Sequence, residues 1–378
     1  MDFALNEDQE LFRSSIRQFL ESKGDLAISR NYMDGKFEVL EEIWEGLGDL
    51  GYMGITVPEN YGGLGLGDLT LVPILEELGR AVIPGPYPET VAFAVPLIEK
   101  YGSEEQKKRY LPEIAEGKRK FSVALFESGG EISPAEIKLR AVENGDSYVL
   151  EGEKVLAPHA DIADTLIVPV RTGGNNSEYG ITLLLIDCKD AKLGYQVQQS
   201  IDETRRMVRV NFDETVVPKS QVLGPIHGGW SLLQKGLYHL NAAWSSTMVG
   251  GIERTVQMAT EYANTRQQFG QPIGRFQAVK HKIVNMKLDL ELSRSLSYYA
   301  SWAVENEAED MVEAVSLATS NNSEAYIRAS SSNIQVHGGM GFTWEFDCHL
   351  FLKRARSLEN HLGTPESHRE IAAVEMGW

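Results

Sequence analysis

The spacing of apolar residues along the first third of the chain follows the period of a helix. Asn6 is a favourable N-cap with Gln9 at the capping-box position, and one apolar face is predicted at Leu11, Phe12, Ile16, Phe19 and Leu20. A glycine-rich turn, Pro58-Glu-Asn-Tyr-Gly-Gly-Leu-Gly65, interrupts the helices. The next helix has leucines at positions 71, 75 and 78 on one face and ends at Pro84-Gly-Pro86.

Between about residues 120 and 223 the period of the apolar residues changes to two. This pattern predicts strands at 121–126, 138–142, 148–156, 165–170, 181–186 and 207–212. Asn144-Gly145 is a hairpin turn signal, and Thr172–Ser177 is a polar loop within the β region. The middle of the chain should therefore form a small β-barrel or sandwich.

Helical spacing returns from Gly229 onward in long segments. An apolar stripe is formed by Phe276, Val279, Ile283, Met286 and Leu290, which is typical of a helix in a bundle. The order of elements predicts an α+β fold with three domains. These are an N-terminal helical domain (1–118), a middle β-barrel (119–225) and a C-terminal four-helix bundle (226–378).

Composition and charge exclude several classes of function. The 36 basic and 54 acidic residues give a net charge of −18, which would repel nucleic-acid phosphates. The start of the chain, Met1–Asn6, lacks the features of a signal peptide, and no apolar run is long enough to span a membrane, so a cytoplasmic location is expected. Cys188 and Cys348 indicate neither a disulfide framework nor a zinc site. The scattered histidines have no metal-ligand spacing, and Trp230, Trp244 and Trp302 are expected in the core.

Four short motifs occur in an informative order. They are Pro58–Gly63, Arg266-Gln-Gln-Phe-Gly270 followed by Phe276-Gln277, Gln335-Val-His-Gly-Gly-Met-Gly341 and Leu362-Gly-Thr364. Together with the order of domains, they resemble the acyl-CoA dehydrogenase superfamily of flavoenzymes over nearly the whole chain. The resemblance implies FAD as cofactor and an acyl-CoA as substrate. It also implies an electron-transfer flavoprotein or a similar acceptor as partner.

The residue types in two of these motifs suit a flavin nucleotide. Gly338-Gly339 offers unobstructed backbone amides to a pyrophosphate, and Arg266 offers a cationic fork. The alternative without a binding role is that Gly338-Gly339 only ends a helix and that Arg266 is a solvated surface charge. The resemblance favours FAD contacts at Arg266, Phe269, Gln277, Gln335, Gly338, Gly339 and Thr364. In the family this part of the site is completed by a neighbouring subunit, so an oligomer is expected.

The catalytic position departs from the family pattern. The resemblance implies α,β-dehydrogenation, in which a glutamate removes the α-proton of the thioester, but Leu362 stands at that position. Some family members place the glutamate in a region that matches Tyr238–Asn241 here, and no acidic residue occurs there. The catalytic base is therefore unknown from the sequence.

The segments expected beside the flavin ring also depart from the family pattern. Phe126 replaces a threonine, and Leu156-Ala-Pro158 replaces a Trp-Ile-Thr strand, which removes a hydroxyl group and a backbone N–H. The hypothesis that follows is a base-lacking subunit of a heteromeric dehydrogenase with a paralogous partner. The Gly341–Glu345 segment resembles a branch of such enzymes, some of which act on steroid or other ring-bearing thioesters in lipid degradation.

Two alternatives remain open. A self-sufficient dehydrogenase, as a homo-oligomer, could use a relocated base, for which Glu89 and Glu359 are weak candidates because each is more commonly a surface side chain. A scaffold or binding protein could have kept the fold and lost the flavin.

Overall fold

The computed structural model describes residues 5–174 and 177–378. It contains two compact units, which we call the helical unit (residues 1–36, 68–84 and 241–378) and the sheet unit (37–67 and 85–240). Part of the predicted polar loop, Asn175 and Asn176, and the chain start, Met1 to Ala4, lie outside the described residues. The units are sets of mutual contacts rather than chain segments, so the domain limits at 118 and 225 stay predictions.

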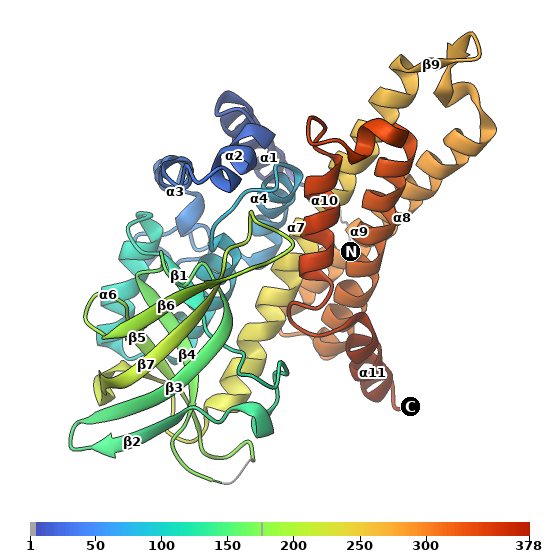
Figure 1. The fold of residues 1–378 in the computed structure, drawn as a ribbon. Helices are drawn as coiled ribbons and strands as arrows, with labels where there is room; N and C mark the ends of the chain where they lie inside the picture. Colours follow the sequence, from blue (N-terminus) through green and yellow to red (C-terminus); the bar gives the residue numbers. More distant parts are fainter. Residues whose placement is uncertain (1–4, 175–176) are drawn as a thin grey trace. The chain divides into compact units, whose positions relative to one another are not determined.

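The helical unit contains the long helices of the C-terminal third. Its helices are α1 (Glu7–Ser22), α2 (Leu26–Met33), α4 (Asp68–Arg80), α7 (Gly229–Thr265, from residue 241), α8 (Gln277–Glu305), α9 (Met311–His337), α10 (Cys348–Leu358) and α11 (Pro365–Glu375). Helix α9 packs against α8, α10 and α11 (Figure 1). The predicted helical character of both ends of the chain is confirmed.

Helix α1 begins with the predicted capping box. The Asn6 side chain accepts a hydrogen bond from the Gln9 backbone N–H at 2.8 Å, and the Gln9 side chain accepts one from the Asn6 N–H at 3.0 Å. Ile16 and Leu20 are buried as predicted, but the prediction is wrong for Leu11, whose side chain is 65% exposed. Leu11 lies five residues before Ile16, so it projects from another side of the helix.

Helices α4 and α7 touch each other through their backbones. A Cβ at Gly250 would lie 1.7 Å from the Glu76 carbonyl oxygen, and one at Gly79 would lie 1.9 Å from the Thr247 carbonyl oxygen. The fully buried Glu76 carboxylate accepts hydrogen bonds from Arg13 at 2.7 Å and Arg294 at 3.3 Å. Glycine thus permits the close approach of the helices, and two arginines neutralise the charge that is buried beside it.

Helix α8 buries only part of its predicted apolar stripe. Met286 and Leu290 are buried, whereas the three earlier positions are half-buried. A second apolar row at a spacing of four residues is 54%, 64% and 52% exposed, at Val284, Leu288 and Leu292. The prediction identified the buried side of the helix and missed this exposed row.

The sheet unit contains the predicted middle β region. In the described residues one sheet has the strand order β6-β7-β3-β2-β4-β5-β8, and β1 pairs with β4. The strands are β1 (Phe121–Val123), β2 (Arg140–Asn144), β3 (Ser147–Pro158), β4 (Thr165–Arg171), β5 (Ile181–Asp187), β6 (Leu193–Gln198), β7 (Met207–Pro218) and β8 (Val222–Leu223). Its helices include α3 (Glu38–Asp49), η3 (Glu89–Ala94), α5 (Val95–Tyr101) and α6 (Glu104–Ala115).

The sheet differs from the prediction at one turn and in two strands. Asn144 pairs with Ser147, so the hairpin loop is Gly145-Asp146, one residue later than predicted, and Gly145 takes the positive φ of 58°. Strands β6 and β8 are absent from the predicted strands, and β8 has only two residues. Strand β6 is short, contains Gly194 and has no fully buried side chain, so no core face marks it in the sequence.

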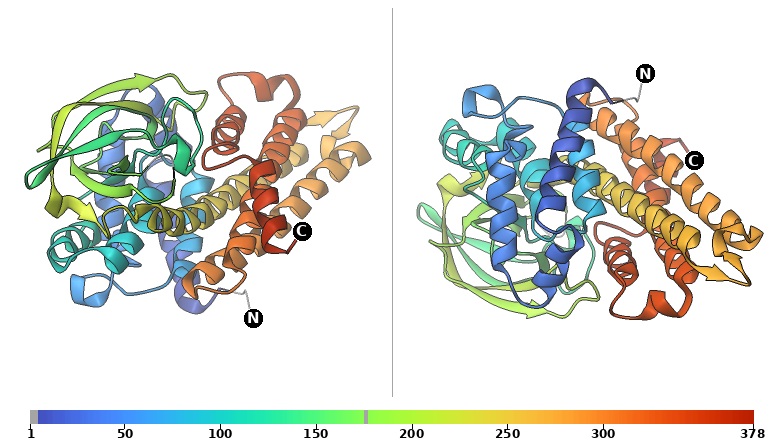
Figure 2. Two further views of the ribbon diagram at one scale, coloured as in Figure 1. Left: turned by 90° about the horizontal axis from the view of Figure 1, so that it is seen from below. Right: turned by 90° about the horizontal axis from the view of Figure 1, so that it is seen from above.

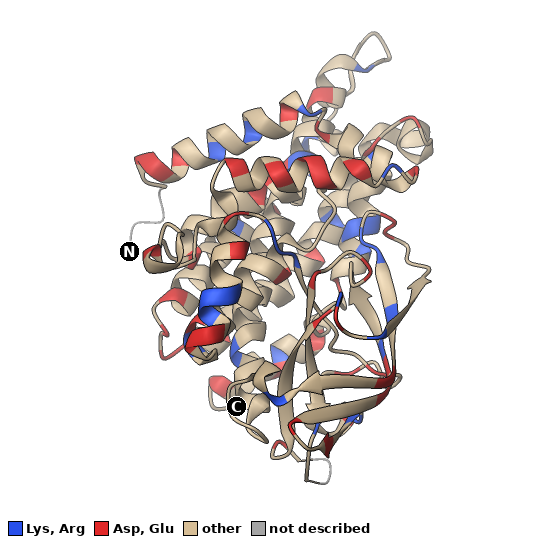
Figure 3. Cartoon of the chain, turned by 90° about the vertical axis from the view of Figure 1, so that its left-hand side faces the viewer, with Lys and Arg blue, Asp and Glu red and all other residues tan. Residues whose placement is uncertain are grey.

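The turn at Pro58–Gly65 requires glycine at one position. A Cβ at Gly63 would lie 2.0 Å from the Val57 carbonyl oxygen. Both cysteines are free, Cys348 buried and Cys188 half-buried, while Trp230 and Trp244 are buried and Trp302 is half-buried. No described helix is both long enough and apolar enough to cross a membrane. Acidic and basic residues both occur along the helices and the strands (Figure 3).

Candidate functional site

The glycine turn predicted to bind FAD follows directly on α9. Helix α9 ends at His337, and the short helix η7 (Gly338–Phe342) begins at Gly338 with a positive φ of 61°. No atom lies within 4 Å of a Cβ built at Gly338 or Gly339, whereas one at Gly341 would lie 2.7 Å from the Ile334 carbonyl oxygen. The first two glycines therefore leave open space beside the backbone, and the third is needed for packing.

The residue before this turn is held by aromatic rings. The His337 ring stacks on Tyr262 of α7 with centroids 4.2 Å apart, and Phe346 meets both rings edge-on. His337 Nδ1 lies 2.9 Å from the Asn333 carbonyl oxygen. Burial lowers the pKa of His337, although this hydrogen bond opposes the shift, so the imidazole is neutral at pH 7.

The Arg266 motif forms a small hairpin between α7 and α8. Strands β9 (Gln267–Gln268) and β10 (Gln271–Pro272) pair in this hairpin, which joins the ends of two long helices (Figure 2). Phe269, between the two strands, has a φ of 51° and is 91% exposed. Gln277 is the first residue of α8. Within the described residues, the exposed Arg266 guanidinium makes no ion pair or side-chain hydrogen bond. A cation and an aromatic ring are thus presented outward.

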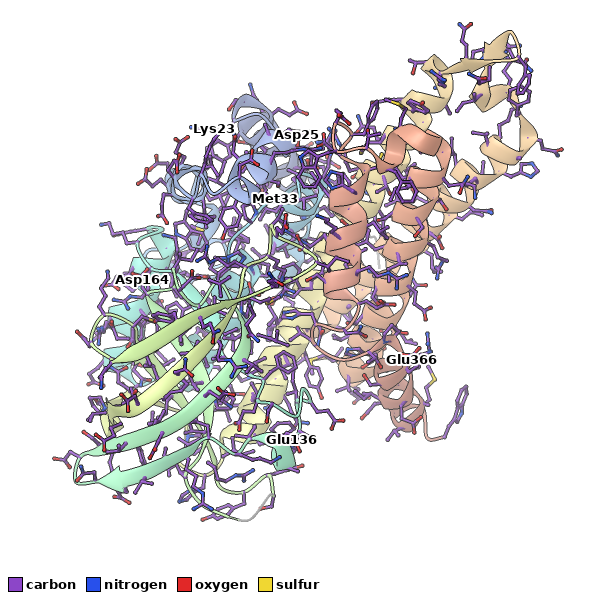
Figure 4. All side chains as sticks on the ribbon, viewed as in Figure 1. Lys23, Asp25, Met33, Glu136, Asp164 and Glu366 are labelled. Carbon is purple, nitrogen blue, oxygen red and sulfur yellow. The ribbon has the colours of Figure 1, made fainter. Side chains whose placement is uncertain are left out.

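The remaining predicted contacts lie in two other places. Gln335 is exposed near the end of α9, close to the glycine turn. Thr364 is the N-cap of α11, and its hydroxyl accepts a hydrogen bond from the Ser367 N–H at 3.1 Å, beside Glu366 (Figure 4). Helix α10, about 16 Å long, runs between the glycine turn and Thr364. The predicted contacts therefore lie at three places along the chain, which are the β9–β10 hairpin with the start of α8, the glycine turn after α9, and the N-terminus of α11.

The turn at Leu362-Gly363-Thr364 has a specific shape. Leu362 is half-buried, and Gly363 has a φ of 124°, so glycine is required there. A Cβ at Gly363 would lie 2.9 Å from Nε2 of His368, a buried imidazole on α11. The carboxylate of Glu359, a candidate base, accepts a hydrogen bond from Arg356 at 2.9 Å.

The segment expected beside the flavin ring has an irregular backbone. The pairing of β3 with β7 shifts between Lys154 and Ala157, and Leu156 has a φ of 53° and is 41% exposed. The Leu156 N–H donates to the Gln198 side-chain oxygen at 2.7 Å. Phe126 is buried. This segment therefore presents a buried ring at Phe126, a partly exposed apolar side chain at Leu156 and a backbone N–H that Gln198 already engages.

A buried ion pair holds strand β3 in place just before Leu156. The Lys154 ammonium group donates to the Glu127 carboxylate at 2.7 Å, and the same oxygen accepts the backbone N–H groups of Lys138 and Leu139 at 3.0 Å each. Burial lowers the pKa of Lys154, and the charge of Glu127 opposes that shift. This pair fixes the residues that flank Phe126 and Val155.

Glu89 lies in the sheet unit close to the ring segment. It begins η3, a single π-helical turn, and is 1% exposed, so its expected surface position is wrong. One Glu89 oxygen lies 3.7 Å from Arg205, which is also buried. The backbone carbonyl oxygen of Arg206, the next residue, accepts a hydrogen bond from the His159 N–H at 2.7 Å. His159 directly follows Pro158. Two neighbouring residues thus connect Glu89 to the Leu156–Pro158 segment.

Sequence reasoning missed three residues at these sites. His368 beneath Gly363 and His159 beside the ring segment are single histidines without an informative spacing. Arg30, which contacts the segment after the glycine turn, lies 317 positions before its partner Asp347. The described residues contain no group of acidic, histidine or cysteine side chains suited to a metal ion.

The residues of the Arg266 motif and the glycine turn fit the nucleotide portion of FAD. Gly338 and Gly339 leave open space beside the backbone for a phosphate group, while the Gly338 N–H itself donates to the Gln335 carbonyl oxygen. The exposed Arg266 suits phosphate oxygens, and the exposed Phe269 can stack on an adenine ring.

Comparison with known proteins gives consistent matches. The models for the acyl-CoA dehydrogenase N-terminal domain and C-terminal domain match residues 6–118 and 227–377. A probable acyl-CoA dehydrogenase of Bacillus subtilis, YngJ, is 29% identical over the full length of both chains. Butyryl-CoA dehydrogenase of Megasphaera elsdenii shares the fold, with a TM-score of 0.92 and 24% identity over all of both chains. The structure described as the FAD complex of PigA is 25% identical, with a TM-score of 0.90 over 100% of this chain and 99% of that one. This chain belongs to the acyl-CoA dehydrogenase superfamily of FAD-dependent oxidoreductases.

Proposed function

We propose that the chain is the base-lacking subunit of a heteromeric acyl-CoA dehydrogenase. The observation that carries this proposal is Leu362, a hydrocarbon side chain on a turn that otherwise keeps a defined shape. Gly363 keeps its positive φ, and Thr364 caps the following helix. A turn that retains its backbone while losing its proton acceptor suits a subunit whose partner supplies the base.

The reaction needs a proton acceptor and a hydride acceptor at adjacent carbons. The α-C–H of a thioester is a very weak acid, and a positioned base contributes about 10²- to 10⁴-fold to its removal. Bound FAD supplies the hydride acceptor for the β-carbon. In this chain neither Leu362 nor Glu359 offers a free basic group, because the first is apolar and the second is paired with Arg356.

The nucleotide-binding half of the site supports a shared flavin. Arg266 and Phe269 are exposed at the β9–β10 hairpin, and the glycine turn leaves open space beside the backbone at Gly338 and Gly339. These groups would hold the pyrophosphate and adenine of an FAD whose ring and base lie in a paralogous subunit. Exposed apolar residues on α8, among them Leu288 at 64%, are compatible with burial in such an oligomer.

The substrate and acceptor follow from this assignment. The substrate is an acyl-CoA, and the Gly341–Glu345 resemblance favours an acyl group with a ring system, as in steroid degradation. The electrons pass to an electron-transfer flavoprotein or a similar acceptor.

A second candidate is a self-sufficient dehydrogenase that uses Glu89 as base. The connection of Glu89 through Arg205 and Arg206 to the ring segment favours it. The ion pair with Arg205 opposes it, because that contact already gives the carboxylate a structural role beside a buried cation. Unchanged turnover in Glu89→Gln would exclude Glu89 as the base.

The test is co-expression with a paralogous dehydrogenase chain, followed by a flavin count and an assay of acyl-CoA oxidation. We expect a stable complex with one FAD for each pair of chains. In this complex, removal of the partner's base should abolish turnover, and Leu362→Ala should leave it nearly unchanged. One catalytically competent flavin on every chain would contradict the proposal.

A further inference from the structure

Arg30 of α2 contacts the segment that follows the glycine turn. Its Nε donates to Asp347 Oδ1 at 2.7 Å, and a second guanidinium nitrogen lies 3.4 Å from Nε2 of His349. Its central carbon lies 5.3 Å from the centre of the Trp344 ring. One side chain from the beginning of the chain therefore touches three residues that come shortly after Gly341.

Trp344 is held by more than this contact. The His349 ring stacks on it with centroids 4.6 Å apart and planes 13° apart, and the Lys353 ammonium lies 5.1 Å from the ring centre. Burial lowers the pKa of His349, and the positive charges of Arg30 and Lys353 add to this effect. A neutral His349 can accept a hydrogen bond from Arg30, which makes the cluster self-consistent at pH 7.

The turn itself has few internal constraints. Gly338, Gly339 and Gly341 lie among its first four residues, and glycine loses more backbone freedom on ordering than other residues. On the N-terminal side the turn is anchored by the His337–Tyr262 stack. On the C-terminal side the anchor is the cluster that Arg30 joins to α2.

We propose that Arg30 is a positioning residue for the flavin-binding turn. By fixing Asp347 and Trp344, it holds the open backbone at Gly338 and Gly339 in place before the cofactor arrives, which removes an ordering cost from binding. The inference rests on the proposed role of this turn in FAD binding. It adds a contribution from a helix that carries none of the recognised motifs.

The test compares Arg30→Ala and Arg30→Lys with a matched control. Arg254→Ala breaks an ion pair of similar burial, with Asp25 beside α2 at 2.8 Å, and this pair does not touch the turn. Hydrogen exchange of residues 338–345 is measured on the flavin-free chain. The FAD dissociation constant is measured on the full chain, alone and in complex with its partner.

We expect Arg30→Ala to speed exchange in 338–345 and to weaken FAD binding by about tenfold or more. Arg30→Lys should fall between wild type and Arg30→Ala, because it keeps the charge and loses the planar fork. Arg254→Ala should match wild type in both readouts. Exchange and affinity that are unchanged in Arg30→Ala would overturn the inference. If wild type binds no FAD and its turn amides show no protection when FAD is added, the proposed function fails instead.

Discussion

Arg205 and Glu89 form an ion pair at 3.7 Å, with both side chains at least 98% buried. A charge in such a position is costly unless its counterion remains, so each residue constrains the other. The pair lies next to the strand segment expected at the flavin ring. It accounts for a buried glutamate in this place without assigning it a role in proton transfer.

Glu89→Gln should therefore affect stability more than chemistry. The substitution removes the Glu89 charge beside the buried Arg205, and we expect the free energy of unfolding to fall by about 3 kcal/mol. Turnover of the assembled enzyme should fall by less than about tenfold, whereas loss of a general base would cost about 10²- to 10⁴-fold. Urea unfolding and steady-state assays measure both effects. Glu99→Gln, at an exposed position on α5, is the control.

Substitutions in the glycine turn should distinguish an effect on FAD affinity from an effect on the free energy of unfolding. Gly339→Ala adds a methyl group in open space, so the free energy of unfolding should change by less than about 0.5 kcal/mol. The same methyl group would obstruct the close approach of a phosphate, and FAD affinity should fall by about tenfold. Gly341→Ala should instead cost roughly 1–3 kcal/mol of stability, because its Cβ would press on Ile334. Equal FAD affinity in Gly339→Ala and wild type would place the cofactor elsewhere.

Helix packing in the helical unit depends on glycine at the α4–α7 contact. Gly250→Ala places a methyl group 1.7 Å from the Glu76 carbonyl oxygen, so the two helices must separate. We expect the free energy of unfolding to fall by about 3 kcal/mol or more. Gly270→Ala would be a poor control because its φ is positive, and Ala278→Gly at an exposed position of α8 is more suitable. A stability loss in Gly250→Ala no larger than in that control would contradict the close contact.

Buried histidines predict a loss of stability in mild acid. Burial is the main cause of a lowered pKa at His337, His349 and His368. The stability that depends on keeping these imidazoles neutral is fully present at a pH above about 6.5, their pKa in the unfolded chain. It is lost as the pH falls from there toward their lower pKa in the folded protein. Each group can contribute a slope of up to about 1.4 kcal/mol per pH unit.

Urea unfolding at pH 7.5, 6.5 and 5.5 measures this dependence. His368→Gln should make the decline between pH 6.5 and 5.5 shallower, whereas His281→Gln, at an exposed position, should not. An identical decline in His368→Gln and wild type would show that this imidazole is protonated as easily in the folded protein as in the unfolded one.

Local signals made much of the fold predictable. The Asn6–Gln9 capping box depends on neighbouring residues alone, and it occurs as predicted. The β2–β3 hairpin also follows from a local signal, with an error of one residue at Gly145. Patterns that depend on one buried face were partly reliable, since Ile16 and Leu20 are buried as predicted and Leu11 is exposed.

Properties that depend on distant contacts were not predictable. The burial of Glu89 requires Arg205, which is 116 positions away in the sequence, and the contact of Arg30 with Asp347 spans almost the whole chain. Strand β6 has no buried face to mark it. At the site, the motifs identified the glycine turn and Leu362, but only the structure shows that Gly338 and Gly339 are open and that His368 lies against Gly363.

The most direct test of a missing base at position 362 is the acyl-CoA oxidation rate of the purified chain, supplied with FAD and an artificial electron acceptor, without a partner. We expect FAD in excess to leave this rate at background and the paralogous partner to restore it. Oxidation at an ordinary enzymatic rate by the chain alone, with one flavin bound per chain, would contradict the account.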